Sequence, residues 1–200
     1  MPREVILATG NAGKLREFQG LLAPLGWTLI CQSERGVVPA VEDGLTFVEN
    51  ALAKARAASA QTGLPALADD SGLVVDALDG APGVHSARYA GAEASDADNI
   101  ARLLVALADT PEAERRAHFH CVLVYLRHAG DPAPLIGQGR WDGCIVEAPR
   151  GTAGFGYDPV FWVPERGCSA AELDAMEKNR LSHRAQALNA LRSQWTGTDH

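Results

Sequence analysis

The chain begins with a short apolar run that breaks at once into a glycine turn, and this feature most constrains its fold. Val5 to Thr9 is typical of a buried strand, Gly10 to Lys14 follows directly, and helical spacing of apolar residues begins at Leu15. In a strand–turn–helix of this kind, glycine lets the backbone approach an anion, the first N–H groups of the helix point at it, and lysine adds a full positive charge. A P-loop is excluded, because that motif has more residues between its glycines and a hydroxyl residue after the lysine. The segment predicts a phosphate site, and its alternative is an ordinary turn with an exposed lysine.

Composition narrows the class of protein. The 200 residues are 46% hydrophobic and 22% charged, which is typical of a globular chain with one substantial core or two lobes. A net charge of −7 counts against a nucleic-acid polymer as partner, but a few lysines or a bound metal can still hold a small anion. The sequence has no membrane-length apolar run and no signal peptide, so we expect a cytoplasmic protein without a membrane partner. The cysteines form no C-x-x-C pair and are expected to be buried free thiols: Cys31, Cys121, Cys144 and Cys168.

The order of elements predicts an α/β fold with a mixed central sheet and flanking helices. We expect helices after the capping box Thr46–Glu49, after Ser95, after a second capping box Ser169–Glu172 and after Ser182. Strand-like stretches of apolar and β-branched residues alternate with them. These stretches are residues 27–32, 66–68, 73–78, 118–126, 138–141, 145–146 and 160–163. We expect a single domain over residues 1–195 and a frayed tail at 196–200.

Two adjacent acids, Asp69 and Asp70, come with Ser71 and Gly72 between two strand-like stretches. This predicts a place at the carboxyl end of a strand, where open α/β sheets bind ligands. Neighbours on a strand point to opposite sides, so one acid can hold a metal or a lysine while the other orients a water. Carboxylate oxygens suit Mg²⁺, which takes one or two of them plus substrate phosphates. The alternative, an Asx turn with solvated acids, is favoured for the cluster alone but not with the phosphate turn upstream.

Other single residues leave two interpretations open. Glu42, just before the first capping box, is either a second metal carboxylate or a surface acid. Lys54 lies one turn after Asn50 on an alanine-rich helix, where a solvated lysine is the commoner case. His118 and His120 alternate on one strand and favour a packed strand face over a metal pair.

A glycine loop and a late helix supply further candidates. Phe155, Gly156, Tyr157 and Asp158 can stack on a flat base and accept a hydrogen bond from a ring N–H, or they can form a hydrophobic latch over the core. Arg184 near the start of a helix runs against the macrodipole preference, which suggests a use beyond stability.

Together these clusters resemble the HAM1-like family of inosine/xanthosine triphosphate pyrophosphatases, also described as dITP/XTP pyrophosphatases, over nearly the whole chain. Several motifs occur in matching order, which is more specific than any one of them. The segments that carry the resemblance are residues 9–14, 47–51 with Lys54, 68–72, 80–83, 86–89, 154–158 and 182–184.

The resemblance implies hydrolysis of ITP, dITP or XTP to the monophosphate and pyrophosphate, with Mg²⁺, in a homodimer whose two lobes surround a nucleotide-binding cleft. It implies that Glu42 and Asp70 serve the metal, with Asp43 as the alternative to Glu42, and that Asp70 is the base for water; Asp69 has no assigned role. The implied substrate-binding residues are Thr9, Gly10, Asn11, Ala12, Gly13, Lys14, Lys54, Ser71, Phe155, Gly156, Tyr157, Asp158, Lys178, His183 and Arg184.

The residues fit this chemistry. Cleavage between the α and β phosphates needs a positioned water, a base and cations, which Asp70 and Mg²⁺ with Lys14 and Lys54 can supply. A donor such as Arg184 facing O6 would favour a 6-oxo purine over adenine. The alternatives are a Maf-like pyrophosphatase of different base specificity and a nucleotide-binding sensor without turnover. An oxidoreductase is excluded for want of G-x-G-x-x-G.

Overall fold

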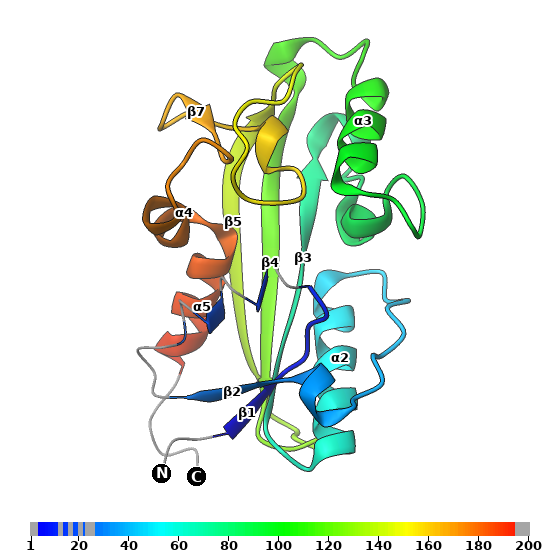
Figure 1. Ribbon diagram of the computed structural model, residues 1–200, viewed down its shortest axis with the longest axis vertical. Coiled ribbons are helices and arrows are strands. Elements are labelled where there is room, and N and C mark those ends of the chain that lie inside the picture. Colours follow the sequence, from blue (N-terminus) through cyan, green and yellow to red (C-terminus); the bar gives the residue numbers. More distant parts are fainter. Residues whose placement is uncertain (1–3, 12–13, 16–17, 20–21, 23–26, 195–200) are drawn as a thin grey trace. The chain divides into compact units, whose positions relative to one another are not determined.

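The computed structural model describes residues 4–11, 14–15, 18–19, 22 and 27–194, and the structural statements below concern these residues. The chain contains both strands and helices (Figure 1). The strands are β1 (Glu4–Leu7), β2 (Thr28–Cys31), β3 (Ala66–Val75), β4 (Arg116–Leu126), β5 (Leu135–Ile145), β6 (Phe161–Val163) and β7 (Cys168–Ser169). The helices are α2 (Phe47–Thr62), α3 (Asp96–Ala106), α4 (Ala175–Leu181) and α5 (His183–Ser193).

The strands form one seven-stranded sheet in the order β2-β1-β3-β4-β5-β6-β7. β1 runs parallel to β2 and β3, whereas β6 pairs antiparallel with both β5 and β7. The sheet is therefore mixed, and the predicted α/β class with flanking helices is confirmed.

The chain divides into two compact units, and the boundary falls inside β3, β4 and β5. The first unit comprises Met1–Asp70, Cys121–Gly139 and Arg184–His200; the second comprises Ser71–His120 and Arg140–His183. The single two-lobed domain over residues 1–195 stays a prediction, and the tail at 196–200 lies outside the described residues.

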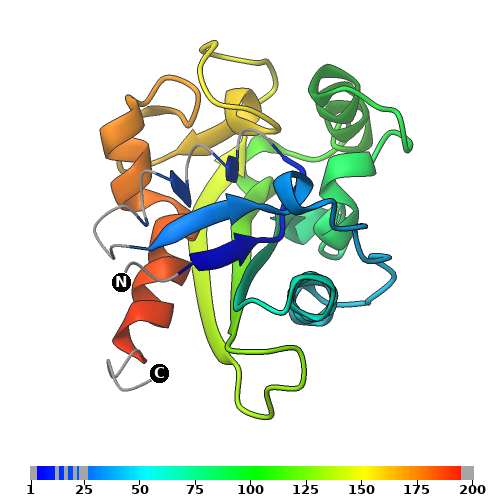
Figure 2. The ribbon, with the colours of Figure 1, turned by 60° about the horizontal axis from the view of Figure 1, so that its bottom comes forward.

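In the first unit, alternate strand residues enter two cores. Ile6 packs in a core with alanines of α2, whereas Val5 and Leu7 pack with Leu188 and Leu191 of α5. The two helices therefore cover opposite faces of the strands (Figure 2). Because α2 meets the sheet through small side chains, its polar residues come close to β3. These small residues are Ala51, Ala55 and Ala58.

The start of α2 confirms the sequence prediction. The Thr46 hydroxyl accepts from Glu49 N, and the Glu49 carboxylate accepts from Thr46 N at 2.8 Å. Gly63 ends the helix in the left-handed conformation, with φ of +70°. The cap fixes where the first turn of α2 begins, and with it the position of Asn50.

The second unit has one core, which α3 and an aromatic cluster fill. Ile100 and Leu103 of α3 enter this core. The Phe119 ring lies 4.5 Å from Phe161 and 6.3 Å from Trp141 between centroids.

The predicted break at residues 69–72 is wrong. β3 runs without interruption through Asp69, Asp70, Ser71 and Gly72. Asp69 and Asp70 are both buried within it, and each forms an ion pair with a lysine of the first unit. Paired carboxylates need no solvent, so they are compatible with a buried strand. The two acids consequently lie within the strand and not at its carboxyl end.

Three other expectations need correction. Residues 138–141 and Ile145 belong to one strand, β5, and Val146 follows its end. The capping box at Ser169 opens a turn and no helix: the Ser169 hydroxyl donates to Arg150 O, and α4 begins later, capped by the Asp174 side chain. All four cysteines are free, but only Cys121 is buried.

The described helices include none with the length and apolar character that crossing a membrane requires.

Candidate functional site

Asp69 and Asp70 are consecutive on β3, and different lysines hold them. The Lys14 ammonium lies 2.7 Å from Asp69 Oδ2, and the Lys54 ammonium lies 2.9 Å from Asp70 Oδ1. Consecutive strand residues point to opposite faces, so each acid meets a separate partner. The expectation that the two acids have separate tasks thus has a structural basis.

Asp69 is held as a carboxylate inside the first unit, where only 1% of it is exposed. Burial raises its pKa, but the positive charges of Lys14, Lys54 and Arg184 outweigh burial and lower the pKa to about 2. Asp69 therefore stays ionised at neutral pH and orients the cations around it.

Asp70 has a different environment. Burial raises its pKa and outweighs the lowering effect of Lys54, so its pKa lies above the usual value for aspartate. Its second oxygen, Oδ2, accepts a hydrogen bond from Asn50 Nδ2 at 3.2 Å. A buried carboxylate with a raised pKa is a better proton acceptor than a solvated one.

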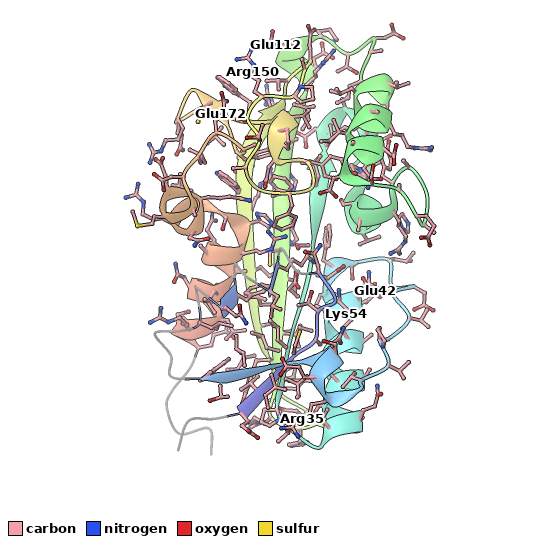
Figure 3. The ribbon with its side chains drawn as sticks, viewed as in Figure 1. Arg35, Glu42, Lys54, Glu112, Arg150 and Glu172 are labelled. Atoms are coloured by element: carbon pink, nitrogen blue, oxygen red, sulfur yellow. The ribbon has the colours of Figure 1, made fainter. Side chains whose placement is uncertain are left out.

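Lys54 joins two carboxylates from different parts of the first unit. Its ammonium lies 3.2 Å from Glu42 Oε2 and 2.9 Å from Asp70 Oδ1. Figure 3 shows Glu42, from the loop before α2, close to Lys54 on α2. Burial lowers the Lys54 pKa, but the negative charges of Asp69, Asp70 and Glu42 together raise it by more, so the pKa lies above the usual value for lysine. Lys54 is thus a firmly charged cation between two carboxylates and not a solvated helix lysine.

The site fits one divalent metal with oxygen ligands. Glu42 and Asp70 already share one cation, and the Glu42 side chain remains 35% exposed. Among the described residues, no group of three or more His, Cys, Asp and Glu could hold a metal. Glu42 and Asp70 offer two carboxylates, which is compatible with the way Mg²⁺ binds together with substrate phosphates. Asp43 is exposed and adjacent, and the shared lysine favours Glu42 over it.

The N-terminal turn differs in detail from the expectation. The Asn11 side chain accepts from Lys14 N at 3.0 Å, and Thr9 Oγ1 accepts from Asn11 N at 3.2 Å. The Lys14 N–H is therefore capped by Asn11 and does not point freely at a ligand. Gly10 is exposed, while Ala12 and Gly13 lie outside the described residues.

The predicted glycine-loop residues belong to the second unit. Asp158 Oδ2 accepts from Lys178 Nζ at 2.5 Å and from Phe155 N at 2.9 Å, and both charged residues are buried. The Lys178 ammonium also lies 5.1 Å from the centre of the Phe155 ring. Asp158 and Lys178 thus fix the loop that carries Phe155.

The side chain of Tyr157 is part of the core. Tyr157 is buried, and its hydroxyl donates to Ser86 O at 2.8 Å. The expectation that two aromatics of this loop stack on a base is therefore wrong for Tyr157, because its ring is enclosed; only the Phe155 ring remains for that task. The backbone N–H of Gly156 donates to Asp96 Oδ2 at 2.7 Å, which ties the loop to α3.

The remaining predicted site residues are Ser71, His183 and Arg184. Ser71 is half-buried and directly follows Asp70. His183 is buried, and its ring stacks on Phe119 at 4.8 Å between centroids. Arg184 is buried in the first unit, where its charge acts on Asp69.

His118 and His120 share a strand face, as predicted. Their ring centroids are 6.2 Å apart, and His118 Nε2 lies 3.3 Å from Arg140 Nη1. An arginine beside the ring nitrogen disfavours a metal there, which agrees with a packed face.

The sequence prediction missed Asn50 as a site residue. Asn50 is only 1% exposed, yet it contacts both Asp70 and the loop that carries Glu42. A buried amide one turn before Lys54, within a run of buried alanines, was the available signal.

The chain is similar to known proteins over almost all of its length. The model of the Ham1 family matches residues 5–194. The dITP/XTP pyrophosphatases of Pectobacterium atrosepticum and Vibrio cholerae are 59% and 56% identical over 94% of this chain, covering 96% and 94% of theirs. A solved HAM1 protein from Coxiella burnetii has a TM-score of 0.89 and 53% identity, covering 96% of this chain and 97% of that one.

Proposed function

Because the chain belongs to the Ham1 family, we propose that it hydrolyses deaminated purine nucleoside triphosphates (ITP, dITP and XTP) to the monophosphate and pyrophosphate. Relatives with 56–59% identity are named dITP/XTP pyrophosphatases. The single observation that supports this best is the Lys54 ammonium between Glu42 and Asp70. This activity removes such nucleotides from the nucleotide pool.

Asp70 is the general base in this proposal. It takes the proton from the attacking water, and its raised pKa suits a proton acceptor. The contacts with Lys54 and Asn50 fix both carboxylate oxygens, so the base is oriented before substrate binds.

Glu42 and Asp70 hold one Mg²⁺. When bound, the ion supplies Lewis-acid stabilisation of the negative charge that develops on the phosphates. The charges of the described residues support the need for a metal cation. Three positive residues face three negative ones, so the negative charge of the triphosphate stays unbalanced. The positive residues are Lys14, Lys54 and Arg184, and the negative ones are Asp69, Asp70 and Glu42.

Lys14 and Lys54 contact the triphosphate in this proposal, together with the turn from Thr9 to Gly13. The side chains of Lys14 and Lys54 are partly exposed, at 15% and 12%, so a phosphate oxygen can reach them. Asp69 keeps Lys14 in place, which gives that acid a positioning task.

The family resemblance supports the assignment of the base-recognising residues. Phe155 stacks on the ring, and Ser71, Gly156, Asp158, Lys178 and His183 complete the contacts. Tyr157 contributes through the loop that it anchors. Arg184 donates to O6, which rewards a keto oxygen and opposes an amino group.

Neither alternative has comparable support. The Maf-like assignment lacks it because the relatives match over nearly the whole chain as dITP/XTP pyrophosphatases. A sensor without turnover has no need for a buried carboxylate whose two oxygens are held by Lys54 and Asn50. On the family resemblance we also propose a homodimer in the cytoplasm.

A substrate panel tests the function. The purified chain should release pyrophosphate from ITP, dITP and XTP with kcat/KM roughly 10²-fold or more above that for ATP, which reflects hydrogen-bond discrimination at O6. Chelation of divalent metal should abolish the activity with every substrate, and added Mg²⁺ should restore it. Equal rates on ATP and ITP, or turnover without a divalent metal, would contradict the proposal.

A further inference from the structure

We infer that Asn50 is a positioning residue that holds Asp70 and the loop of Glu42 in one fixed arrangement. The inference rests on the proposed function, because the two carboxylates matter only if they serve the metal and the water. Among the described residues, the side-chain hydrogen bonds of Asn50 go to Gly44 and Asp70 and not to the proposed phosphate lysines.

The Asn50 amide is used on both sides. Its Nδ2 donates to Asp70 Oδ2 at 3.2 Å, and its Oδ1 accepts from Gly44 N at 2.9 Å. The same Nδ2 lies 3.5 Å from Gly44 O. One side chain therefore links β3, α2 and the loop before α2, and it needs a donor and an acceptor at once.

Asp70 is consequently fixed at both oxygens. Lys54 donates to Oδ1, and Asn50 donates to Oδ2. Without Asn50, the carboxylate could rotate about its bond to the backbone while Lys54 still holds one oxygen. A rotated carboxylate would present the wrong lone pair to the water.

Glu42 is fixed through the same amide. We define the strap as residues 38–44, which precede α2. Asn50 holds its end at Gly44, and Gln61 holds its start: the Gln61 amide donates to Val38 O and accepts from Val38 N, both at 2.9 Å. Asn50, Lys54 and Gln61 are spaced by four and seven residues, so they share one face of α2, and all three contact the strap.

Gly44 shows how closely the strap approaches Asn50. A Cβ at Gly44 would lie 2.7 Å from Asn50 Oδ1 and 2.8 Å from Glu49 Cβ. Only a residue without a side chain fits there while the Gly44–Asn50 hydrogen bond is kept. The backbone at Gly44, two residues after Glu42, therefore packs directly against the Asn50 amide.

Two substitutions test the role of Asn50. Asn50→Asp keeps the shape and the acceptor for Gly44, but it loses the donor and places a second carboxylate beside Asp70. Asn50→Ala loses both contacts. Supporting groups around metal ligands typically contribute ~10–100-fold, so we expect kcat for ITP to fall by that factor in both variants while KM changes by less than about threefold. The matched control is Ser59→Ala, which removes another buried hydrogen bond of α2, to Leu64 O, away from the strap.

A second measurement needs no turnover. Mn²⁺ alone, followed by electron paramagnetic resonance without nucleotide, should bind roughly tenfold more weakly to Asn50→Ala than to the wild type. Ser59→Ala should bind Mn²⁺ as the wild type does. Asn50 variants with wild-type kcat per folded molecule, or with losses no larger than those of Ser59→Ala, would overturn the inference. If the wild type itself releases no pyrophosphate from ITP, the proposed function fails instead.

Discussion

Replacement of Asp70 with asparagine is expected to lower kcat for ITP by about 10²–10⁴-fold, the usual contribution of a general base. The amide cannot accept the proton of water. It also fits the site poorly, because Lys54 and Asn50 both donate to Asp70, so the new NH₂ group must face a donor whichever way it turns. Metal binding should weaken as well, since one of two carboxylate charges is lost.

The measurement is steady-state kinetics of pyrophosphate release, with circular dichroism to establish folding. Asp142→Asn is the matched control, because Asp142 is a surface acid of the second unit that pairs with Arg140. If Asp70→Asn keeps more than about a tenth of wild-type kcat, Asp70 is not the base.

Arg184→Ala is expected to reduce the preference for ITP over ATP by roughly ten- to a hundredfold, as loss of a charged hydrogen bond predicts. A fixed cationic donor at O6 rewards a keto oxygen and opposes the amino group of adenine, so its removal abolishes both effects. The quantity to compare is kcat/KM for ITP and ATP on the variant and the wild type.

The structure gives Arg184 a second task that the control must separate. Arg184 is buried in the first unit, and its positive charge lowers the Asp69 pKa. Arg184→Lys keeps this charge but loses the planar fork of donors, so it should retain stability while losing selectivity. Equal losses of kcat/KM on ITP and ATP in both variants would mean that Arg184 serves Asp69 and the fold.

The sequence predicted local structure best where a local interaction sets it. The capping box at Thr46 sets the start of α2 within the chain segment itself, and this start was predicted. The second capping box failed at Ser169 because its hydroxyl bonds to Arg150 O, nineteen residues away. Local patterns cannot show which distant group competes for a side chain.

The prediction that the strand breaks at Asp69 and Asp70 was wrong for the same reason. Two adjacent aspartates predict a turn, since unpaired carboxylates do not belong in a buried strand. Lys14 and Lys54 pair with them from elements 55 and 16 residues earlier in the chain, and those pairs keep the strand continuous. Asn50 was missed because its contact with Asp70 depends on which face of α2 lies against β3. The packing of the α2 alanines fixes that face, and the local sequence does not show it.

The family resemblance supplied the list of site residues, because the residue patterns by themselves left functional and structural interpretations open. Sequence reasoning could not choose between a solvated Lys54 and a functional one, and the structure shows an ammonium shared by two carboxylates. For the glycine loop, the resemblance named Tyr157 along with Phe155, and the packing separates them: one ring is enclosed in the core, and the other lies against Lys178.

The central claim is that the carboxylates around Lys54 perform the hydrolysis with one metal. A crystal structure of the chain with Mg²⁺ and a non-hydrolysable ITP analogue, with an imido link between the α and β phosphates, tests it most directly. We predict Mg²⁺ bound to oxygens of Glu42 and Asp70, with the ammonium groups of Lys14 and Lys54 on phosphate oxygens. A triphosphate bound away from both lysines, or an ion that contacts neither carboxylate, would contradict the claim.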